Sequence, residues 1–147
     1  MTTRAPYLIL IVLLACFSCQ RKAASVTAID ALKKLEATAE VGGAYDQYSA
    51  LLVDAKLKVE AANASLEDGP FRSNLNSALD NYLDAGTVWK MALRNEPISI
   101  RAHPGQTILP KYSIQVNDQG FTTDYDAALD AIWTAARFRM AALTKEN

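Results

Sequence analysis

Apolar residues recur every three or four positions along four stretches of the chain. The clearest stretch is 44–66, where the alternation is unbroken through Tyr45, Tyr48, Leu52, Ala55, Val59, Ala62 and Leu66. This spacing places the apolar side chains on one face of an α-helix. The same period predicts further helices over 26–41, from about 70 to 95, and from about 123 to 144.

Glycines mark the joint between the first two stretches. Gly42 and Gly43 interrupt the pattern, and the second apolar stripe, extended backwards, is one residue out of phase with the first. One residue corresponds to about 100° of rotation around a helix. The phase break therefore predicts two helices joined by a turn, with a single bent helix as the alternative.

The third stretch begins at Pro70 and the fourth follows a long interruption. Proline suits the first position of a helix, because it lacks only an N–H group that would have no partner there. Over 96–123 the helical period vanishes, and Pro and Gly residues punctuate the chain. Two short alternations there, 98–100 and 112–116, allow one or two extended pieces.

These elements predict an all-α fold. Four amphipathic helices, two short joints and one long connection are typical of an up-down four-helix bundle, here with a long irregular loop between helices three and four. A three-helix bundle with one bent long helix is the alternative. A Gly inside a helix costs up to about 1 kcal/mol relative to Ala, so Gly86 in the third helix indicates a close helix crossing or a kink.

The first nineteen residues follow a different pattern. Arg4 precedes an apolar run over 7–15 that is followed by Cys16. As a helix, 5–19 would rise only ~22 Å, less than the ~30 Å hydrocarbon core of a bilayer. A positive start, a short apolar middle and a small residue before the break are the marks of an export signal.

The end of this run resembles the lipobox of bacterial lipoproteins, which reads aliphatic, small or aliphatic, small, then Cys. Leu13, Leu14, Ala15 and Cys16 match it. The resemblance implies cleavage before Cys16 and acylation of that residue, with Cys19 as the alternative acceptor and a plain signal peptide as the alternative reading.

That resemblance also implies a location and a division of the chain. The residue after Cys16 is Phe17, whereas an Asp there tends to retain lipoproteins at the inner membrane. The expected place is therefore membrane-anchored and extracytoplasmic, at the periplasmic face of the outer membrane if the host is Gram-negative. We expect a signal peptide over 1–15, a lipidated tether over 16–25 and one helical domain over 26–147.

Charge and composition exclude several classes of function. Without Arg4, 14 basic and 16 acidic side chains remain, which leaves no positive surplus for binding nucleic acid. His103 is the only histidine, too few for the Glu-x-x-His pairs of di-metal bundles or for a zinc site. The acidic pairs Asp80/Asp84 and Asp126/Asp130 are expected to face solvent. We therefore predict no metal, no cofactor and no catalysis.

Aromatic residues gather toward one end of the expected bundle. If neighbouring helices are antiparallel, the end away from the lipid carries Tyr45, Tyr48, Trp89, Tyr125 and Trp133. The long loop should lie there too, with Arg101, His103, Tyr112 and Phe121. Two interpretations stay open: a binding site with aromatic walls and a loop lid, or a loop that seals the bundle and completes its core.

These features together predict a non-catalytic binding module of the bacterial cell envelope, held in the membrane by its N-terminal lipid. Its expected partner is an envelope protein at the aromatic end. The alternatives are a small-molecule binder or sensor with an aromatic pocket, its ligand unknown, and a structural spacer of the envelope.

Overall fold

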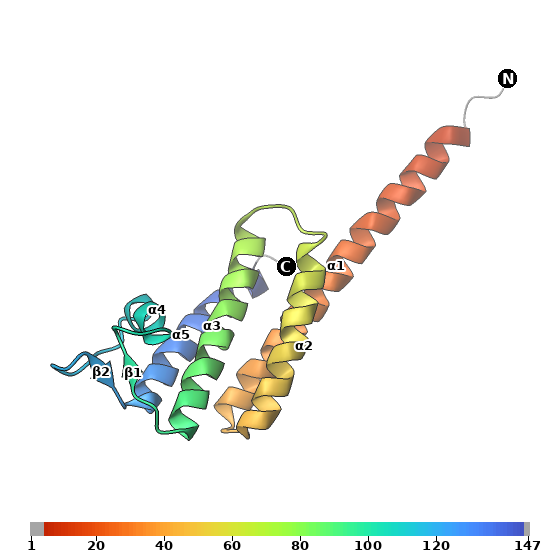
Figure 1. Ribbon diagram of the computed structural model, residues 1–147. Helices are drawn as coiled ribbons and strands as arrows, with labels where there is room; N and C mark the ends of the chain where they lie inside the picture. The colour runs from red at the N-terminus through yellow and green to blue at the C-terminus, as the bar shows by residue number, and fades with distance from the viewer. Residues whose placement is uncertain (1–4, 146–147) are drawn as a thin grey trace.

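The computed structural model describes the backbone of residues 5–145 and the side chains of residues 22–145. This part of the chain is mainly helical, and the predicted all-α class is confirmed. Its elements are α1 (Ala5–Glu40), α2 (Tyr45–Asn63), α3 (Pro70–Leu93), β1 (Ile98–Ser99), α4 (Gly105–Lys111), β2 (Phe121–Thr122) and α5 (Tyr125–Lys145). Four of the helices are long, and β1, α4 and β2 belong to the segment between α3 and α5 (Figure 1).

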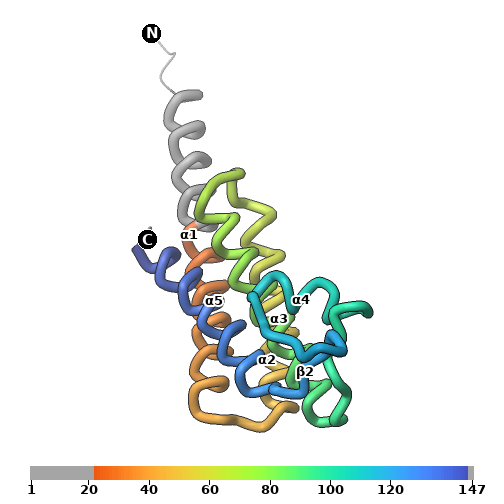
Figure 2. The backbone as a smooth tube through the Cα atoms, turned by 90° about the vertical axis from the view of Figure 1, so that its left-hand side faces the viewer, coloured from red at the N-terminus to blue at the C-terminus, as the bar shows by residue number. Residues whose placement is uncertain are grey.

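The long helices pack side by side around one core. α1 contacts α2 and α5, α2 contacts α3, and α3 contacts α5 most extensively (Figures 1 and 2). The α1–α2 turn lies at the same end of the bundle as the connection that leaves α3 (Figure 1). The largest fully buried side chains come from every long helix, and include Leu32, Leu35, Tyr48, Val59, Leu75, Tyr82, Ile132 and Leu143.

The turn between α1 and α2 is the one predicted at the glycines. Gly42 has φ 65°, a left-handed conformation that suits glycine. The Gly43 N–H donates a hydrogen bond to the Thr38 carbonyl oxygen at 3.0 Å, which closes the end of the helix. The two helices are separate, so the alternative of one bent helix is wrong.

The first helix begins earlier than the periodicity predicts. A start at Val26 was expected, but α1 is continuous from Ala5. Ser25 is buried and Ala24 packs against the core, because the apolar face continues one turn before Val26. The side chains of Cys16 and Cys19 lie outside the described residues, so their lipidation stays a prediction. Within the described part, no helix is long and apolar enough to cross a membrane.

The segment over 96–123 is more ordered than an irregular loop. β1 and β2 pair in antiparallel fashion, with Ile98 opposite Thr122. The extended piece at Ile98 was predicted, whereas the second strand lies after the expected 112–116 piece. Helix α4 was not predicted, because Gly105 and Pro110 argue against a helix. Ile98, Ile108 and Leu109 from this segment are buried in the core, which favours the interpretation that it completes the core.

Candidate functional site

Four of the predicted aromatic residues come together at the end of the helices where α2 begins. The Trp89 ring lies 5.9 Å from the Tyr45 ring, 5.3 Å from the Tyr48 ring and 5.9 Å from the Trp133 ring, measured between centroids. Tyr48 is fully buried, and its hydroxyl donates to the Tyr82 carbonyl oxygen at 2.9 Å. Burial raises the pKa of the Tyr48 hydroxyl. These rings pack on one another, which does not favour a pocket between them.

The other predicted site residues lie elsewhere. Tyr125 donates to the Glu96 carbonyl oxygen at 3.1 Å, across the start of α5. Arg101 and His103 are exposed in the connection between β1 and α4. Tyr112 contacts Asn81 and Asp84 on α3 and none of the four clustered rings. The structure therefore does not assemble the expected aromatic site under a loop lid.

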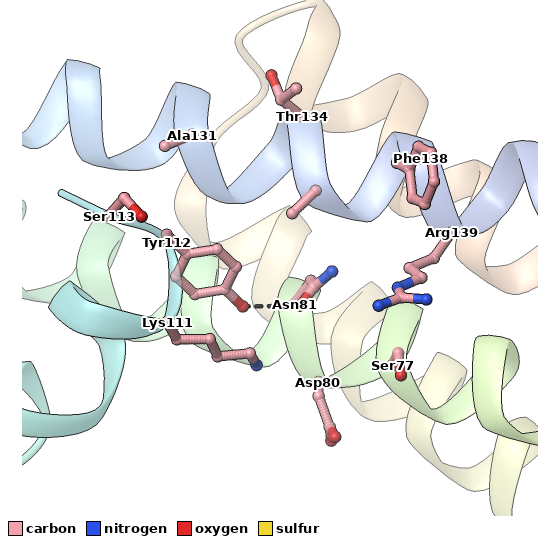
Figure 3. A pocket seen from close by; sticks show the side chains of 11 residues that line it. Ser77, Asp80, Asn81, Lys111, Tyr112, Ser113, Ala131, Thr134, Phe138 and Arg139 are labelled. Carbon is pink, nitrogen blue, oxygen red and sulfur yellow. Dashed lines mark hydrogen bonds between the residues drawn. The ribbon is translucent and has the colours of Figure 1, made fainter.

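A groove of about 580 Å³ lies between α3 and α5, next to the C-terminal end of α4 (Figure 3). Helix α3 contributes Ser77, Asp80 and Asn81 to its lining, and α5 contributes Ala131, Thr134, Ala135, Phe138 and Arg139. The remaining lining residues are Lys111, which ends α4, and Tyr112 and Ser113, which follow it. The groove thus has polar side chains on both helices, together with two alanines and the Phe138 ring on α5. Within the described residues, no group of His, Cys, Asp and Glu side chains is placed to hold a metal ion.

Tyr112 fastens the α4 end of the groove to α3. Its hydroxyl lies 2.7 Å from Asn81 Oδ1 and 2.7 Å from Asp84 Oδ2. The Lys111 ammonium donates to the same Asp84 oxygen at 2.7 Å. The hydroxyl has one proton, and the Asp84 carboxylate can only accept, so Tyr112 donates to Asp84 and contacts the Asn81 amide as its second partner on α3. Burial, and then the hydrogen bond to Asp84, raise the pKa of Tyr112, so the hydroxyl keeps its proton.

Asn81 is a polar side chain in an apolar position. Only 5% of the residue is exposed, and its amide oxygen faces Tyr112. The other end of its amide group faces the groove (Figure 3).

Arg139 approaches the same part of the groove from α5. One of its nitrogens donates to Asn74 Oδ1 at 3.2 Å, and its guanidinium lies 5.8 Å from the centre of the Phe138 ring. In the part of the chain that the structure describes, Arg139 has no carboxylate partner. Phe138 beside it is 70% exposed, an unusual exposure for a large aromatic ring.

The apolar pattern of the sequence does not predict this groove, although the sequence holds one sign of it. Asn81 occupies the apolar face of α3 shared by Ala78 and Ala85, and a polar residue at a core position marks a place where a partner is needed. Asp84 was expected to face solvent; its side chain is 25% exposed, and its carboxylate accepts hydrogen bonds from Lys111 and Tyr112. These partners come 27 and 28 residues later, beyond the reach of a helical period.

The groove is therefore the candidate functional site, in preference to the packed aromatic cluster. Its volume falls within the range of small-molecule sites, about 300–1,000 Å³, and its polar groups come from three separate segments. Compared with protein-family profiles, with curated proteins and with solved structures, the chain matches none.

Proposed function

We propose that this chain is a lipid-anchored, extracytoplasmic protein that binds a small molecule in the groove between α3 and α5, without catalysing a reaction. The observation that carries the proposal is the groove itself, on which the polar side chains of Asn81, Tyr112 and Arg139 converge. A hollow with apolar walls and a few convergent polar groups is the usual form of a small-molecule site.

The scaffold of this proposal is an up-down four-helix bundle. Its support is the cycle of neighbouring contacts, α1 with α2, α2 with α3, α3 with α5 and α5 with α1. In such bundles, ligand sites are built from side chains on facing helices. Here the facing helices are α3 and α5, and the inserted α4 segment forms one side of the groove.

The membrane anchor in the proposal is an acyl chain on Cys16, with Cys19 as the alternative. Its support is the lipobox-like run Leu13-Leu14-Ala15-Cys16. The core begins at Ala24, and eight residues of helix rise only ~12 Å. The bundle would therefore stand close to the membrane, at the periplasmic face of the outer membrane in a Gram-negative host.

A protein partner in the envelope is the second candidate. Val53 and Leu57 lie one turn apart on α2 and are 60% and 62% exposed. Neighbouring apolar side chains of this kind are a surface that a partner can cover. Crosslinking in the envelope should then recover less partner from a Val53→Glu, Leu57→Glu double variant than from the natural chain.

Filling the groove tests the small-molecule proposal. Ala135 lines the groove on α5, so Ala135→Trp should occupy it, while Ala141→Trp places the same ring on an exposed part of the same helix. Ligand-observed NMR against a collection of small polar molecules should find some that bind the natural chain and Ala141→Trp, but not Ala135→Trp. Binding that survives in Ala135→Trp, or no binding to the natural chain, contradicts the proposal.

A further inference from the structure

We infer that a second copy of this chain covers the outer face of α2, so that two copies associate through their α2 helices. The outer face is defined by its exposed apolar residues, Ala50, Val53, Leu57 and Ala61. The inference goes beyond the proposed function, because no residue of α2 is among those that line the groove between α3 and α5. It names one occupant for the surface around Val53 and Leu57.

Helix α2 is apolar on two opposite sides. Its buried residues, which face the core, are Tyr48, Ala55, Val59 and Ala62. Leu57 lies two positions from Ala55 and from Val59, which is ~200° around the helix, and it is 62% exposed. An α-helix that is apolar all round is normally buried on every side. The described part of the chain covers the inner face of α2 and leaves the outer face exposed.

The outer face has the spacing of a contact between two helices. Its residues recur every three or four positions, so they form one stripe along α2. The two large side chains, Val53 and Leu57, lie in the middle of the stripe, and an alanine lies at each end. The small residues let a second helix approach closely, while the large ones supply apolar surface to bury. A second helix is therefore the shape that fits this face.

Charged residues lie on both flanks of the stripe. On one flank, Lys58 Nζ lies 2.7 Å from Asp54 Oδ2. On the other flank, Lys56 Nζ lies 3.9 Å from Glu60 Oε1. These four side chains are between 32% and 58% exposed, so charged groups of a second helix can reach them. Each flank thus offers one carboxylate and one ammonium group to its occupant.

The order of these charges complements a second copy of α2. When two α2 helices lie along each other with Leu57 opposite Leu57, each acid lies ~3 Å along the axis from a lysine of the other copy. The acid and the lysine come from opposite flanks in a parallel pair and from the same flank in an antiparallel pair. Ion pairs along the flanks of paired helices select the partner and its register. The formal net charge of −1 also adds little repulsion between copies.

Disruption of the apolar stripe tests whether copies associate through α2. Sedimentation equilibrium of the full chain in detergent, at concentrations up to about 1 mM, should show a dimer. The double variant Val53→Glu, Leu57→Glu should dimerise at least about tenfold more weakly, because it places carboxylates where apolar surface is buried.

The matched control makes the same two changes outside α2. Val41 and Leu93 are 81% and 61% exposed, so Val41→Glu, Leu93→Glu adds the same charge at equally accessible apolar positions. This control should dimerise like the natural chain. Chance sharing of a detergent micelle would affect both double variants equally. Thermal unfolding confirms that each variant is folded.

Exchange of the flanking charges tests whether the occupant is a second copy. One variant, Lys56→Glu, Lys58→Glu, makes both flanks acidic, and another, Asp54→Lys, Glu60→Lys, makes both flanks basic. Each variant alone should dimerise at least about tenfold more weakly than the natural chain, because like charges then meet across the stripe. An equimolar mixture of the two should restore dimers that contain one chain of each kind. Labelling one variant with a fluorophore identifies these mixed dimers.

The outcomes bear on this inference separately from the proposed function. A natural chain that stays monomeric at about 1 mM overturns the inference. So does a Val53→Glu, Leu57→Glu variant that dimerises as well as its control, or a mixture of the acidic and basic variants that associates no better than each alone. In all three cases the groove between α3 and α5 is unaffected, and the ligand screen with Ala135→Trp decides on it.

Discussion

Several polar side chains in this protein occupy positions that the apolar pattern would assign to the core. Tyr48 is enclosed by the aromatic cluster and donates to the Tyr82 carbonyl oxygen. Asn81 and Tyr112 meet at the groove. Tyr48 and Asn81 are buried, so their polar atoms depend on partners within the protein. Single substitutions at these positions therefore test whether these hydrogen bonds stabilise the fold.

Removal of the Tyr48 hydroxyl should destabilise the protein. Tyr48→Phe deletes a buried hydrogen bond of 2.9 Å and leaves the Tyr82 carbonyl without this donor, so we expect a loss of about 1 kcal/mol in the free energy of unfolding. Urea unfolding followed by tryptophan fluorescence measures the change. Tyr45→Phe is the control, because none of the described hydrogen bonds uses its hydroxyl. Equal effects of the two substitutions would contradict the assignment.

Glu36 should make stability depend on pH in the acidic range. Burial, and then repulsion by Glu40, raise its pKa above the usual value of 4.5, although Arg137 and Lys33 act in the opposite direction. Because the folded state binds the proton more tightly than the unfolded state, stability is lost as pH rises from below 4.5 through the raised pKa. Glu36→Gln should therefore raise the melting temperature at neutral pH. Near pH 3.5 the gain should vanish, and a gain of equal size at both pH values would contradict this account.

At the scale of elements, α2 and α3 meet closely at a glycine. A Cβ atom added to Gly86 would lie 3.1 Å from Leu52 Cδ2 and 3.5 Å from Tyr48 Cε1. The close crossing predicted from a glycine inside a helix is thus confirmed. The favourable helix propensity of a larger residue would be opposed by crowding against α2.

A branched residue at Gly86 should push the two helices apart. Gly86→Val should cost about 1–3 kcal/mol in the free energy of unfolding, because it overfills a packed contact. Gly69→Ala is the matched control, since a Cβ there meets nothing within 4 Å, and it should be neutral or slightly stabilising. Chemical denaturation of both variants gives the comparison. A Gly86→Val variant as stable as the natural chain would show that the crossing tolerates the extra volume.

The position of α4 depends on the contact of Tyr112 with α3. Tyr112→Phe should lower the free energy of unfolding by about 1–2 kcal/mol, because it removes a hydroxyl bonded to an amide and to a carboxylate. Amide hydrogen exchange over 105–111 should become faster, since α4 is then held by fewer contacts. Tyr125→Phe, which removes an exposed hydrogen bond, should leave exchange in α4 unchanged. Unchanged exchange in Tyr112→Phe would mean that burial of Ile108 and Leu109 alone holds the helix.

At the scale of the whole molecule, apolar periodicity predicts the long helices and the turn between the first two. It does not predict contacts between residues that lie far apart in the sequence. The helices over 45–63, 70–93 and 125–145 follow from apolar periodicity, and the turn at Gly42 follows from the phase break. The aromatic cluster could be predicted because its members lie near helix ends that share one end of the molecule. These features depend on residues close together in the chain.

The groove and α4 could not be predicted in the same way. Asn81 and Arg139 come from helices separated by the whole inserted segment, and Tyr112 reaches α3 from outside any periodic stretch. Pro110 within α4 is a residue that usually ends a helix, so local propensity favoured a loop there. Burial of Ile108 and Leu109 against the core overrides that local preference.

The central proposal is a binding groove on a helical domain that is held at a membrane by a lipid on Cys16. The intact mass of the chain recovered from the membrane fraction of an expressing bacterium tests this claim most directly. The account predicts the mass of residues 16–147 plus acyl chains. A mass equal to the unmodified residues 16–147, or to all 147 residues, would contradict the lipid anchor.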